Sequence, residues 1–367
     1  MSADRSLDTF LHTAGWADAE RVALTGDAST RRYIRLHRGG TTGLLMDQPQ
    51  GAEAPTAAAN ATPQQRQALG YNAVARLAGA DVGRFVAAAN YLRGLGLSAP
   101  EIYAADAAQG FVLMEDLGAD LFTDSLAKGV DEHQLYQGAA EVLARLHAET
   151  APAVLPPGKV LHAYDETALV AEVELLTEWF FPVGLGRPAT ANEVADFRGL
   201  WQAALAPVLG ARPVFVHRDY HAQNLMWMPG RDGAARVGLI DFQDGVAGSP
   251  AYDMISLVED ARRDVSPEAG RLTLSHYLNE MRQQGTPVDE AAFALEMALY
   301  AAQRNTKIVG IFARLFRRDG KARYLDLLPR VWSYLRADLN HPALAELKLW
   351  YDRTIPLEAR GVPNPGV

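Results

Sequence analysis

The chain has 367 residues, a formal net charge of −9, and hydrophobic residues at 49% of its positions. That length is enough for two domains or for one large bilobal domain with an apolar core. The acidic balance, without a basic cluster, argues against a nucleic-acid partner. The absence of cysteine excludes disulfides, thiolate zinc sites and a thiol nucleophile.

The distribution of apolar residues along the sequence suggests neither export nor membrane insertion. Residues 1–15 carry charges throughout and lack the apolar core of a secretory signal. The most apolar later stretches, such as Ala291–Ala302 with its Glu296, are short and interrupted by charge. We therefore expect a cytoplasmic protein with no membrane contact, and the sequence indicates no obligate protein partner.

Three short β-prone runs, at 22–25, 33–36 and 43–46, are separated by turn-rich segments and predict a three-strand meander. The first turn contains Gly26 and ends with Ser29 and Thr30. In one interpretation its backbone N–H groups cover the phosphates of a nucleotide. In the other it is an ordinary hairpin turn. The motifs further along the chain favour the phosphate loop.

The next segment, at about 50–67, is rich in Ala, Pro, Gln and Thr and nearly devoid of large apolar residues. It predicts a flexible insertion or an exposed loop, and we assign it no chemistry. Residues 81–93 follow with apolar side chains at helical spacing and predict a helix.

An apolar run at 111–114 breaks into acidic residues and glycine, which predicts a buried strand that ends in a hinge at 116–118. This gives an N-terminal nucleotide-binding lobe over 1–115 and a helical C-terminal lobe over 119–367. Backbone groups near Met114, Glu115 and Asp116 would pair with an adenine edge. The competing interpretation is a plain strand end.

The remainder of the chain is predicted to be mainly helical. Asp131 with Gln134 resembles a capping box at a helix start. Apolar spacing predicts helices at about 131–146, 164–180, 190–209, 250–263, 267–284, 288–303, 305–317, 321–337 and 342–353.

Two segments carry the chemistry: Phe215–Asn224 and Gly238–Asp244. Asp219 and Asn224 are five residues apart, and Asp241 ends an apolar run seventeen residues later. Phosphoryl transfer from ATP requires one group that orients the attacking hydroxyl and oxygen ligands that hold Mg²⁺. The pattern matches H-R-D-x-x-x-x-N in full but has Asp-Phe-Gln where protein kinases have Asp-Phe-Gly. We expect Asp219 to be catalytic and Asn224 and Asp241 to bind Mg²⁺.

The alternative for these residues is structural: turn residues that close a hairpin. Turn chemistry does not explain why Asn224 and Asp241 each border an apolar run. We expect three neighbours to support the site structurally. His217 and His221 would hold the catalytic loop by hydrogen bonds, and Asp253 lies at a predicted helix start after Ser249 and Pro250.

With these motifs the chain resembles the aminoglycoside phosphotransferase and choline kinase superfamily, whose fold is similar to that of protein kinases. The resemblance rests on His217–His221 with Asn224, on Ile240–Phe242 and on Ala251–Asp253. More closely, the chain looks like the anomeric sugar kinases that act on N-acetylmuramate and N-acetylglucosamine. The stretches that support this are 27–33, 113–118, 239–250 and 304–312.

The resemblance implies an α+β, bilobal, protein-kinase-like fold with a small β-rich N-lobe and a larger, mostly helical C-lobe. It also implies transfer of the ATP γ-phosphoryl group to the anomeric hydroxyl of these amino sugars during peptidoglycan recycling, with Mg²⁺ as cofactor. Rival acceptors are an aminoglycoside, choline or homoserine. A protein kinase or an inactive ATP-binding scaffold is the remaining alternative, and no Ala-Pro-Glu follows Asp241 to support the former.

One departure from the general kinase pattern affects phosphate binding. Kinases hold the phosphates with a strand lysine paired to a helix glutamate. The first lysine here is Lys128, and residues 81–93 contain no glutamate. Arg31 or Arg32 would supply the charge, since guanidinium binds phosphate in a bidentate manner. The alternative is that both arginines face solvent.

Candidate substrate residues fall on two predicted helices. Glu174 and Trp179 lie on the first, and Arg304, Asn305 and Lys307 begin the second. An aromatic face beside hydrogen-bonding groups suits an amido sugar, and a cation suits the lactyl carboxylate of N-acetylmuramate. Core or interface packing is the competing account of the same residues.

Overall fold

The computed structural model describes residues 2–24, 30–49 and 53–363, and the side chains from Leu7 onward within them. The chain forms two compact units. Unit 1 comprises the N-terminal part up to His162 together with His217–Ala247, and unit 2 comprises Ala163–Val216 and the chain from Gly248 onward. The lobe boundary expected at 116–118 stays a prediction.

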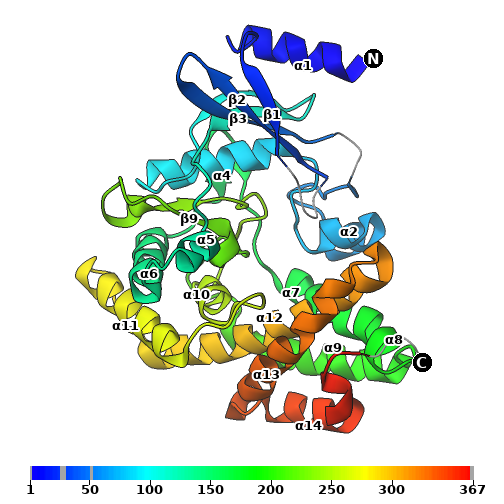
Figure 1. Cartoon of the computed structure of the whole chain (residues 1–367). Coiled ribbons are helices and arrows are strands. Elements are labelled where there is room, and N and C mark those ends of the chain that lie inside the picture. The colour runs from blue at the N-terminus through cyan, green and yellow to red at the C-terminus, as the bar shows by residue number, and fades with distance from the viewer. Residues whose placement is uncertain (1, 25–29, 50–52, 364–367) are drawn as a thin grey trace. The chain divides into compact units, whose positions relative to one another are not determined.

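Unit 1 contains a five-stranded antiparallel sheet with the strand order β1-β2-β3-β5-β4. Figure 1 labels its first three strands, β1, β2 and β3. Its strands are β1 (Glu20–Ala23), β2 (Arg32–Arg38), β3 (Thr41–Asp47), β4 (Ile102–Asp106) and β5 (Phe111–Glu115). The predicted meander and the predicted strand at 111–114 are confirmed. Strand β4 was not predicted, because its apolar alternation is weak and broken by two alanines.

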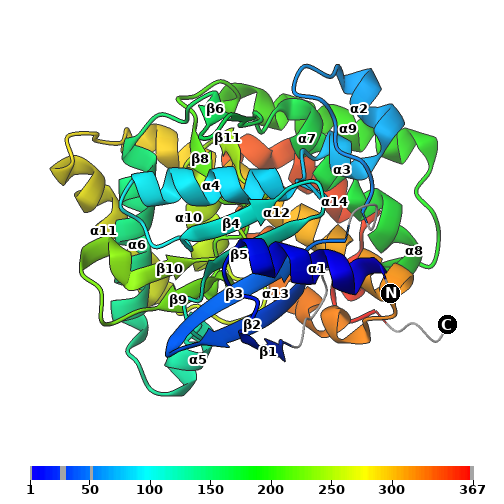
Figure 2. The same cartoon turned by 90° about the horizontal axis from the view of Figure 1, so that it is seen from above.

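The two faces of this sheet have different neighbours, as strand alternation requires. Helix α1 (Ser2–Thr13) covers one face, where Phe10 and Leu11 join Leu36 and Leu45 in one core cluster. Helix α4 (Val82–Gly94), predicted at 81–93, lies on the other side of the sheet (Figure 1). Figure 2 shows α4 alongside β4 and β5, the strands it contacts.

The segment predicted to be irregular at 50–67 is partly helical, and the prediction is wrong for residues 63–67. Helix α2 (Pro63–Leu69) begins at Thr62, whose side chain accepts from the Gln65 N–H while Gln65 accepts from the Thr62 N–H. Arg66 is buried and donates to the Val74 carbonyl. Pro63 at the first helical position and the capping box were the missed signals.

The rest of unit 1 consists of short helices and two hairpins. Helix α6 confirms the predicted helix at 131–146, and Asp131 caps it by accepting from the His133 N–H. The bounds of α6 are Glu132–Ala148. The remaining elements are α3 (Tyr71–Val74), α5 (Phe122–Ala127), β6 (Val154–Leu155), β7 (Lys159–Val160), β9 (Leu225–Trp227) and β10 (Val237–Leu239).

Unit 2 is mainly helical. Its helices are α7 (Glu166–Val173), α8 (Phe181–Gly184), α9 (Ala191–Leu205), α10 (Ala251–Val258), α11 (Pro267–Gln283), α12 (Glu290–Asp319), α13 (Leu328–Asp338) and α14 (Ala345–Thr354). A π-helical turn, Leu176–Phe180, joins α7 to α8. Short strands are β8 (Val214–Val216) and β11 (Val246–Gly248), the latter at the boundary of the units. Single 3₁₀ turns in the chain are Ala206–Val208, Ala222–Asn224, Gly233–Arg236, Ala322–Leu327, Pro342–Leu344 and Leu357–Arg360.

Most predicted helices of this unit are present, but the two expected at 288–303 and 305–317 are one continuous helix, α12. The polar run that begins at Arg304 does not break it, because these side chains are buried among partners within the unit. Gly310 allows a close approach: a Cβ there would lie 2.4 Å from the carbonyl carbon of Leu175.

A β-rich N-terminal part and a largely helical remainder match the predicted α+β class. Within the described residues, no helix combines the length and apolar character needed to cross a membrane.

Candidate active site

The β9–β10 hairpin brings the two expected metal ligands together. The strands pair antiparallel with Leu225 opposite Leu239, and the Ile240 N–H donates to the Asn224 carbonyl at 3.2 Å. Asn224 immediately precedes β9, and Asp241 follows β10 by two residues. The turn of this hairpin lies at the opposite end, at 228–236, so neither residue closes the hairpin, although Asn224 ends the preceding 3₁₀ turn.

The loop that contains Asp219 is hydrogen-bonded to the same hairpin. The Asn224 side chain donates from Nδ2 to the Asp219 carbonyl at 2.9 Å. His217 is buried, with its ring 5.6 Å from that of Tyr220 and 6.4 Å from that of Phe242. His221 accepts from the Gln223 N–H at 3.3 Å. Both histidines thus occupy the surroundings expected of loop supports, although their role stays a prediction.

Asn224 and Asp241 each present an oxygen with no hydrogen-bond partner among the described residues. Asn224 uses only its Nδ2, which leaves Oδ1, and Asp241 accepts on Oδ1 from Gln243 (2.7 Å) and Arg31 (3.3 Å), which leaves Oδ2. Burial raises the pKa of Asp241, and the nearby charge of Asp219 raises it further. The open oxygens, one from a carboxamide and one from a carboxylate, are donors of the kind that Mg²⁺ takes in proteins.

The backbone at this site is unusual. Asp241 and Arg218 adopt left-handed conformations, with φ of 63° and 75°. Non-glycine residues rarely do so, and such strain is concentrated at functional sites. Arg218 is held by donation from Nη1 to the Ala75 carbonyl at 3.0 Å.

Of the two candidate phosphate-binding arginines, only Arg31 lies at this site. Its side chain is 11% exposed and donates from Nε to Gln48 Oε1 at 3.0 Å as well as to Asp241. Burial, which would lower the pKa of Arg31, is outweighed by neighbouring Tyr33 and Asp241, which raise it. Arg32 begins β2 and is exposed, so the structure does not support Arg32 as a phosphate ligand.

A cavity of about 480 Å³ in unit 1 extends from these groups. Arg31, Asn224 and Asp241 form its polar end. Its apolar walls are Leu24, Leu44, Phe85, Met114, Leu121, Met226 and Ile240. An apolar slot that ends in a few convergent polar groups is the usual form of a ligand site, and this one separates a place for a base from a place for phosphates.

The predicted hinge lines the same cavity, but the side chains of Glu115 and Asp116 are already paired. Arg35 binds the Asp116 carboxylate at 2.5 and 3.2 Å and the Gly118 carbonyl at 3.2 Å. Glu115 pairs with Arg231 at 2.5 Å. The backbone N–H and C=O of Leu117, in contrast, have no partner within the described residues. Any adenine contact would therefore be to the backbone.

Gly26 and Ser29 of the predicted phosphate loop lie outside the described residues. Thr30 is described and exposed. Its hydroxyl accepts from Gln48 Nε2 at 3.0 Å and donates to Glu53 Oε1 at 2.9 Å. Sequence reasoning missed Gln48 and Arg35. The signal for Arg35 was its place in strand alternation with Tyr33, whose side chain also lines the cavity.

The expected substrate residues all belong to unit 2. Glu174 ends α7 and pairs with Arg198, whose Nε lies 2.6 Å from its Oε1. Trp179 is half-buried in the π-helical turn. Such turns occur often at functional sites, so Trp179 stays a candidate for sugar contact.

Two of the three candidates on α12 have other partners. Lys307 donates to Tyr252 Oη at 2.8 Å and pairs with Glu172 at 3.3 Å. Asn305 is fully buried and donates to the carboxylates of Glu259 (2.7 Å) and Asp338 (2.9 Å). The structure therefore does not support a direct substrate contact by Asn305. The charge of Lys307 is balanced by Glu172 within the unit.

Arg304 differs from both. It is 3% exposed and donates from Nη1 to the Glu259 carbonyl at 3.2 Å, with no carboxylate at ion-pair distance among the described residues. Asp253 is fully buried in the first turn of α10, where a carboxylate stabilises the helix N-terminus. That agrees with a supporting role for Asp253, which stays a prediction.

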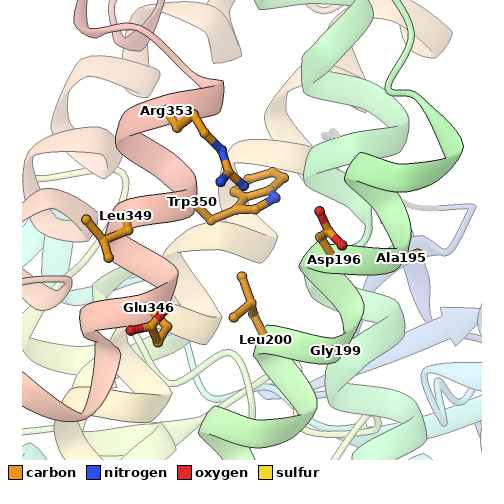
Figure 3. Close-up of a pocket in the computed structure, with 8 residues that line it drawn as sticks. All are labelled: Ala195, Asp196, Gly199, Leu200, Glu346, Leu349, Trp350 and Arg353. Atoms are coloured by element: carbon orange, nitrogen blue, oxygen red, sulfur yellow. The ribbon is translucent and has the colours of Figure 1, made fainter.

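A second hollow in unit 2 contains none of these residues. It has a volume of about 490 Å³ and lies between α9 and α14 (Figure 3). Its lining is Ala195, Asp196, Gly199, Leu200, Glu346, Leu349, Trp350 and Arg353. Without a group suited to phosphoryl transfer, we assign it no part in the reaction.

Comparison with known proteins agrees with this geometry. Residues 20–288 match the model of the Phosphotransferase enzyme family. A protein of Caulobacter vibrioides called N-acetylmuramate/N-acetylglucosamine kinase is 45% identical over 96% of each chain. One of the same name from Pseudomonas aeruginosa is 31% identical over 94% of this chain and 92% of that protein.

Among solved structures, the choline kinase LicA of Streptococcus pneumoniae superposes with a TM-score of 0.56 at 15% identity. The match covers 94% of this chain and 99% of that one. It confirms the predicted kinase-like fold. The extent of the family match and the identity to the two kinases lead to one conclusion: the chain is a phosphotransferase and belongs to the Phosphotransferase enzyme family.

Proposed function

We propose that this enzyme transfers the γ-phosphoryl group of ATP, with Mg²⁺, to the anomeric hydroxyl of N-acetylmuramate and N-acetylglucosamine. The observation that carries the proposal is the pair of open oxygens, Asn224 Oδ1 and Asp241 Oδ2, beside the Asp219 loop. The names of relatives that match over more than nine-tenths of the chain supply the acceptor. The reaction would serve cytoplasmic recycling of cell-wall sugars.

Each group of the site has a distinct task. Asp219 accepts a hydrogen bond from the attacking hydroxyl and takes its proton late, because the transition state is loose and depends on positioning more than on basicity. Asn224 Oδ1 and Asp241 Oδ2 would hold Mg²⁺, which neutralises charge on the β- and γ-phosphate oxygens when bound. Arg31 binds the phosphates through its guanidinium.

The nucleotide base would occupy the apolar part of the unit 1 cavity, between Leu44 and Met226. The free backbone groups of Leu117 would pair with its edge. Arg35 fixes the hinge by donating to the Asp116 carboxylate and the Gly118 carbonyl, so the backbone groups of Leu117 are held in one conformation. Such preorganisation reduces the entropy cost of binding.

In unit 2, Arg304 is the cation best suited to the lactyl carboxylate, which only N-acetylmuramate carries. Replacing it by glutamine should raise the KM for N-acetylmuramate roughly 10- to 100-fold, the range for loss of one charge-assisted hydrogen bond. The KM for N-acetylglucosamine serves as the internal control and should stay within about threefold. Equal losses for both sugars would remove Arg304 from carboxylate recognition.

The reacting hydroxyl is tested with blocked sugars. Both amino sugars should release ADP, whereas their 1-O-methyl glycosides and borohydride-reduced alditols should not. The product phosphate should be acid-labile and should couple to the anomeric proton in NMR. A phosphate mapped to O6, or faster turnover of an aminoglycoside, choline or homoserine in the same panel, would overturn the acceptor assignment.

A further inference from the structure

The arginine that takes the place of the usual lysine has no helix carboxylate to hold it. Kinases position their phosphate-binding lysine by pairing it with a glutamate. Here α4, the helix beside the sheet, contains no glutamate, and its sequence is VGRFVAAANYLRG. Arg31 must therefore be positioned by other groups. It donates to Asp241 at 3.3 Å and to Gln48 at 3.0 Å, and it also forms a side-chain hydrogen bond with Tyr33.

Gln48 is unusually well fixed for a polar residue at a strand end. It directly follows β3, is 1% exposed, and donates its backbone N–H to the Gly110 carbonyl at 2.9 Å. Both ends of its carboxamide are used: Oε1 accepts from Arg31 Nε, and Nε2 donates to the Thr30 hydroxyl. Swapping the oxygen and the nitrogen would set a donor against a donor at Arg31, so the amide has one satisfactory orientation.

A neutral amide suits this position better than a carboxylate. A buried glutamate would form an ion pair with Arg31 and neutralise the charge that phosphates require. Glutamine supplies the same acceptor geometry to Nε without that cost. Arg31 is thus oriented by the neutral Gln48 together with Asp241 and Tyr33, and Gln48 adds no negative charge to the one that Asp241 supplies.

We propose that Gln48 is the positioning residue for Arg31 and that the Gln48–Arg31 pair does the work of the missing glutamate–lysine pair. The inference rests on the proposed use of ATP. Gln48 touches no nucleotide itself and acts through Arg31. Its second bond, to Thr30, extends the same control to the end of the expected phosphate loop, and Thr30 is anchored in turn by Glu53 at 2.9 Å.

The test is a double-mutant cycle on nucleotide affinity. Gln48→Leu removes both bonds and should raise the KM for Mg·ATP about tenfold, with the KM for the sugar unchanged. In an Arg31→Ala background, Gln48→Leu should change the KM for Mg·ATP by no more than about twofold, because Gln48 acts only through Arg31. Gln67→Leu, at an exposed glutamine of α2, is the matched control and should behave as wild type.

Gln48→Glu and Gln48→Asn keep the proposal falsifiable if the leucine variant folds poorly. The glutamate keeps the acceptor for Arg31 Nε but adds a negative charge that offsets Arg31, and asparagine is one methylene too short to reach Arg31, so both variants should raise the KM for Mg·ATP while leaving the KM for the sugar unchanged. Additive effects of Gln48→Leu and Arg31→Ala, or equal rises in both substrate KM values, would show a merely structural role. A wild-type protein without ATP turnover would instead contradict the proposed function.

Discussion

The two units each contain a partly or wholly buried ion pair of the same length, and the pairs differ in what surrounds them. Arg31 and Asp241 in unit 1 are 3.3 Å apart, as are Lys307 and Glu172 in unit 2. The Asp241 side chain is 44% exposed and keeps Oδ2 without a partner among the described residues, whereas Glu172 is 1% exposed.

Glu172 has both oxygens engaged. Lys307 binds Oε1, and Tyr164 and Gln303 donate to Oε2. Removing two charges from water is expensive, and only extra hydrogen bonds offset that cost. The unit 2 pair meets the requirement and is part of the architecture. The unit 1 pair differs in one respect: Asp241 Oδ2 has no partner among the described residues, which leaves that oxygen available to a cation. Unused bonding capacity therefore marks the reactive site better than charge alone.

The largest effect should come from Asp219→Asn, which keeps the side-chain shape and one acceptor oxygen but removes the charge and turns the other oxygen into a donor group. We expect turnover to fall by roughly 10²–10⁴-fold, as for other positioned acid–base groups. Unfolding free energy and nucleotide affinity should change little, because the carboxylate supports chemistry rather than packing. Asp120→Asn, at an exposed pair with Lys128, is the control. Steady-state kinetics measures the turnover of both variants. A wild-type rate in Asp219→Asn would show that Asp219 takes no part in the mechanism.

The unit 2 pair should show the opposite pattern: a stability effect. Lys307→Met leaves Glu172 as a buried charge that has lost its cation, and about 3–5 kcal/mol of unfolding free energy should be lost. Lys348→Met breaks a half-exposed pair with Asp352 and should cost no more than about 1 kcal/mol. Urea denaturation measures both. A small loss for Lys307→Met would mean that Glu172 takes up a proton or regains water, and the contrast between the pairs would weaken.

Arg31 and Arg32 are adjacent in sequence and so provide a matched pair for the open site. Arg31→Ala should raise the KM for Mg·ATP by an amount on the order of 1.5–3 kcal/mol, the value of a hydrogen bond to a charged group. Arg32→Ala should leave it unchanged, since Arg32 is exposed at the start of β2. Equal effects from the two would show that the region's net charge, and not one positioned guanidinium, attracts the nucleotide.

The parts of the site that the sequence predicted are those in which chemistry imposes a linear pattern. Asp219, Asn224 and Asp241 match a motif of fixed spacing, so the sequence alone could propose roles for them, and these roles stay predictions. Arg35 and Gln48 escaped notice because their function arises from register: β2 pairs with β3, and alternate side chains face the cavity. Alternation with Tyr33 places Arg35 on the cavity face of β2, but no local pattern shows which groups Arg35 or Gln48 binds.

The errors have physical causes of the same kind. The polar run at Arg304–Lys307 was predicted to separate two helices, yet buried partners in or next to α7, α10 and α13 satisfy Asn305 and Lys307 within an unbroken α12. The low-complexity stretch before Leu69 looked irregular because its helix depends on one capping box and one buried arginine. Tertiary partners determined both outcomes, and one sequence does not reveal them.

The smallest expected effect concerns a third buried cluster, in which Asn305 donates to both Glu259 and Asp338. Burial, followed by the charge of Glu259, raises the pKa of Asp338 to about 9. A pKa raised on folding means that the folded state binds the proton more tightly than the unfolded chain does. Unfolding free energy should therefore fall as pH rises between about 4 and about 9.

Asp338→Asn removes this titration while keeping an oxygen that can accept from Asn305. Relative to wild type, the variant should gain stability as pH rises, by about 1 kcal/mol between pH 6 and pH 8. The limit of about 1.4 kcal/mol per pH unit is not reached, because a half-buried group regains some water. Asp326→Asn, at an exposed carboxylate, is the control. A stability difference between variant and wild type that does not change with pH would show that Asp338 is ionised in the folded protein. The cluster would then resemble the Arg31–Asp241 pair of unit 1 more than the Lys307–Glu172 pair of unit 2.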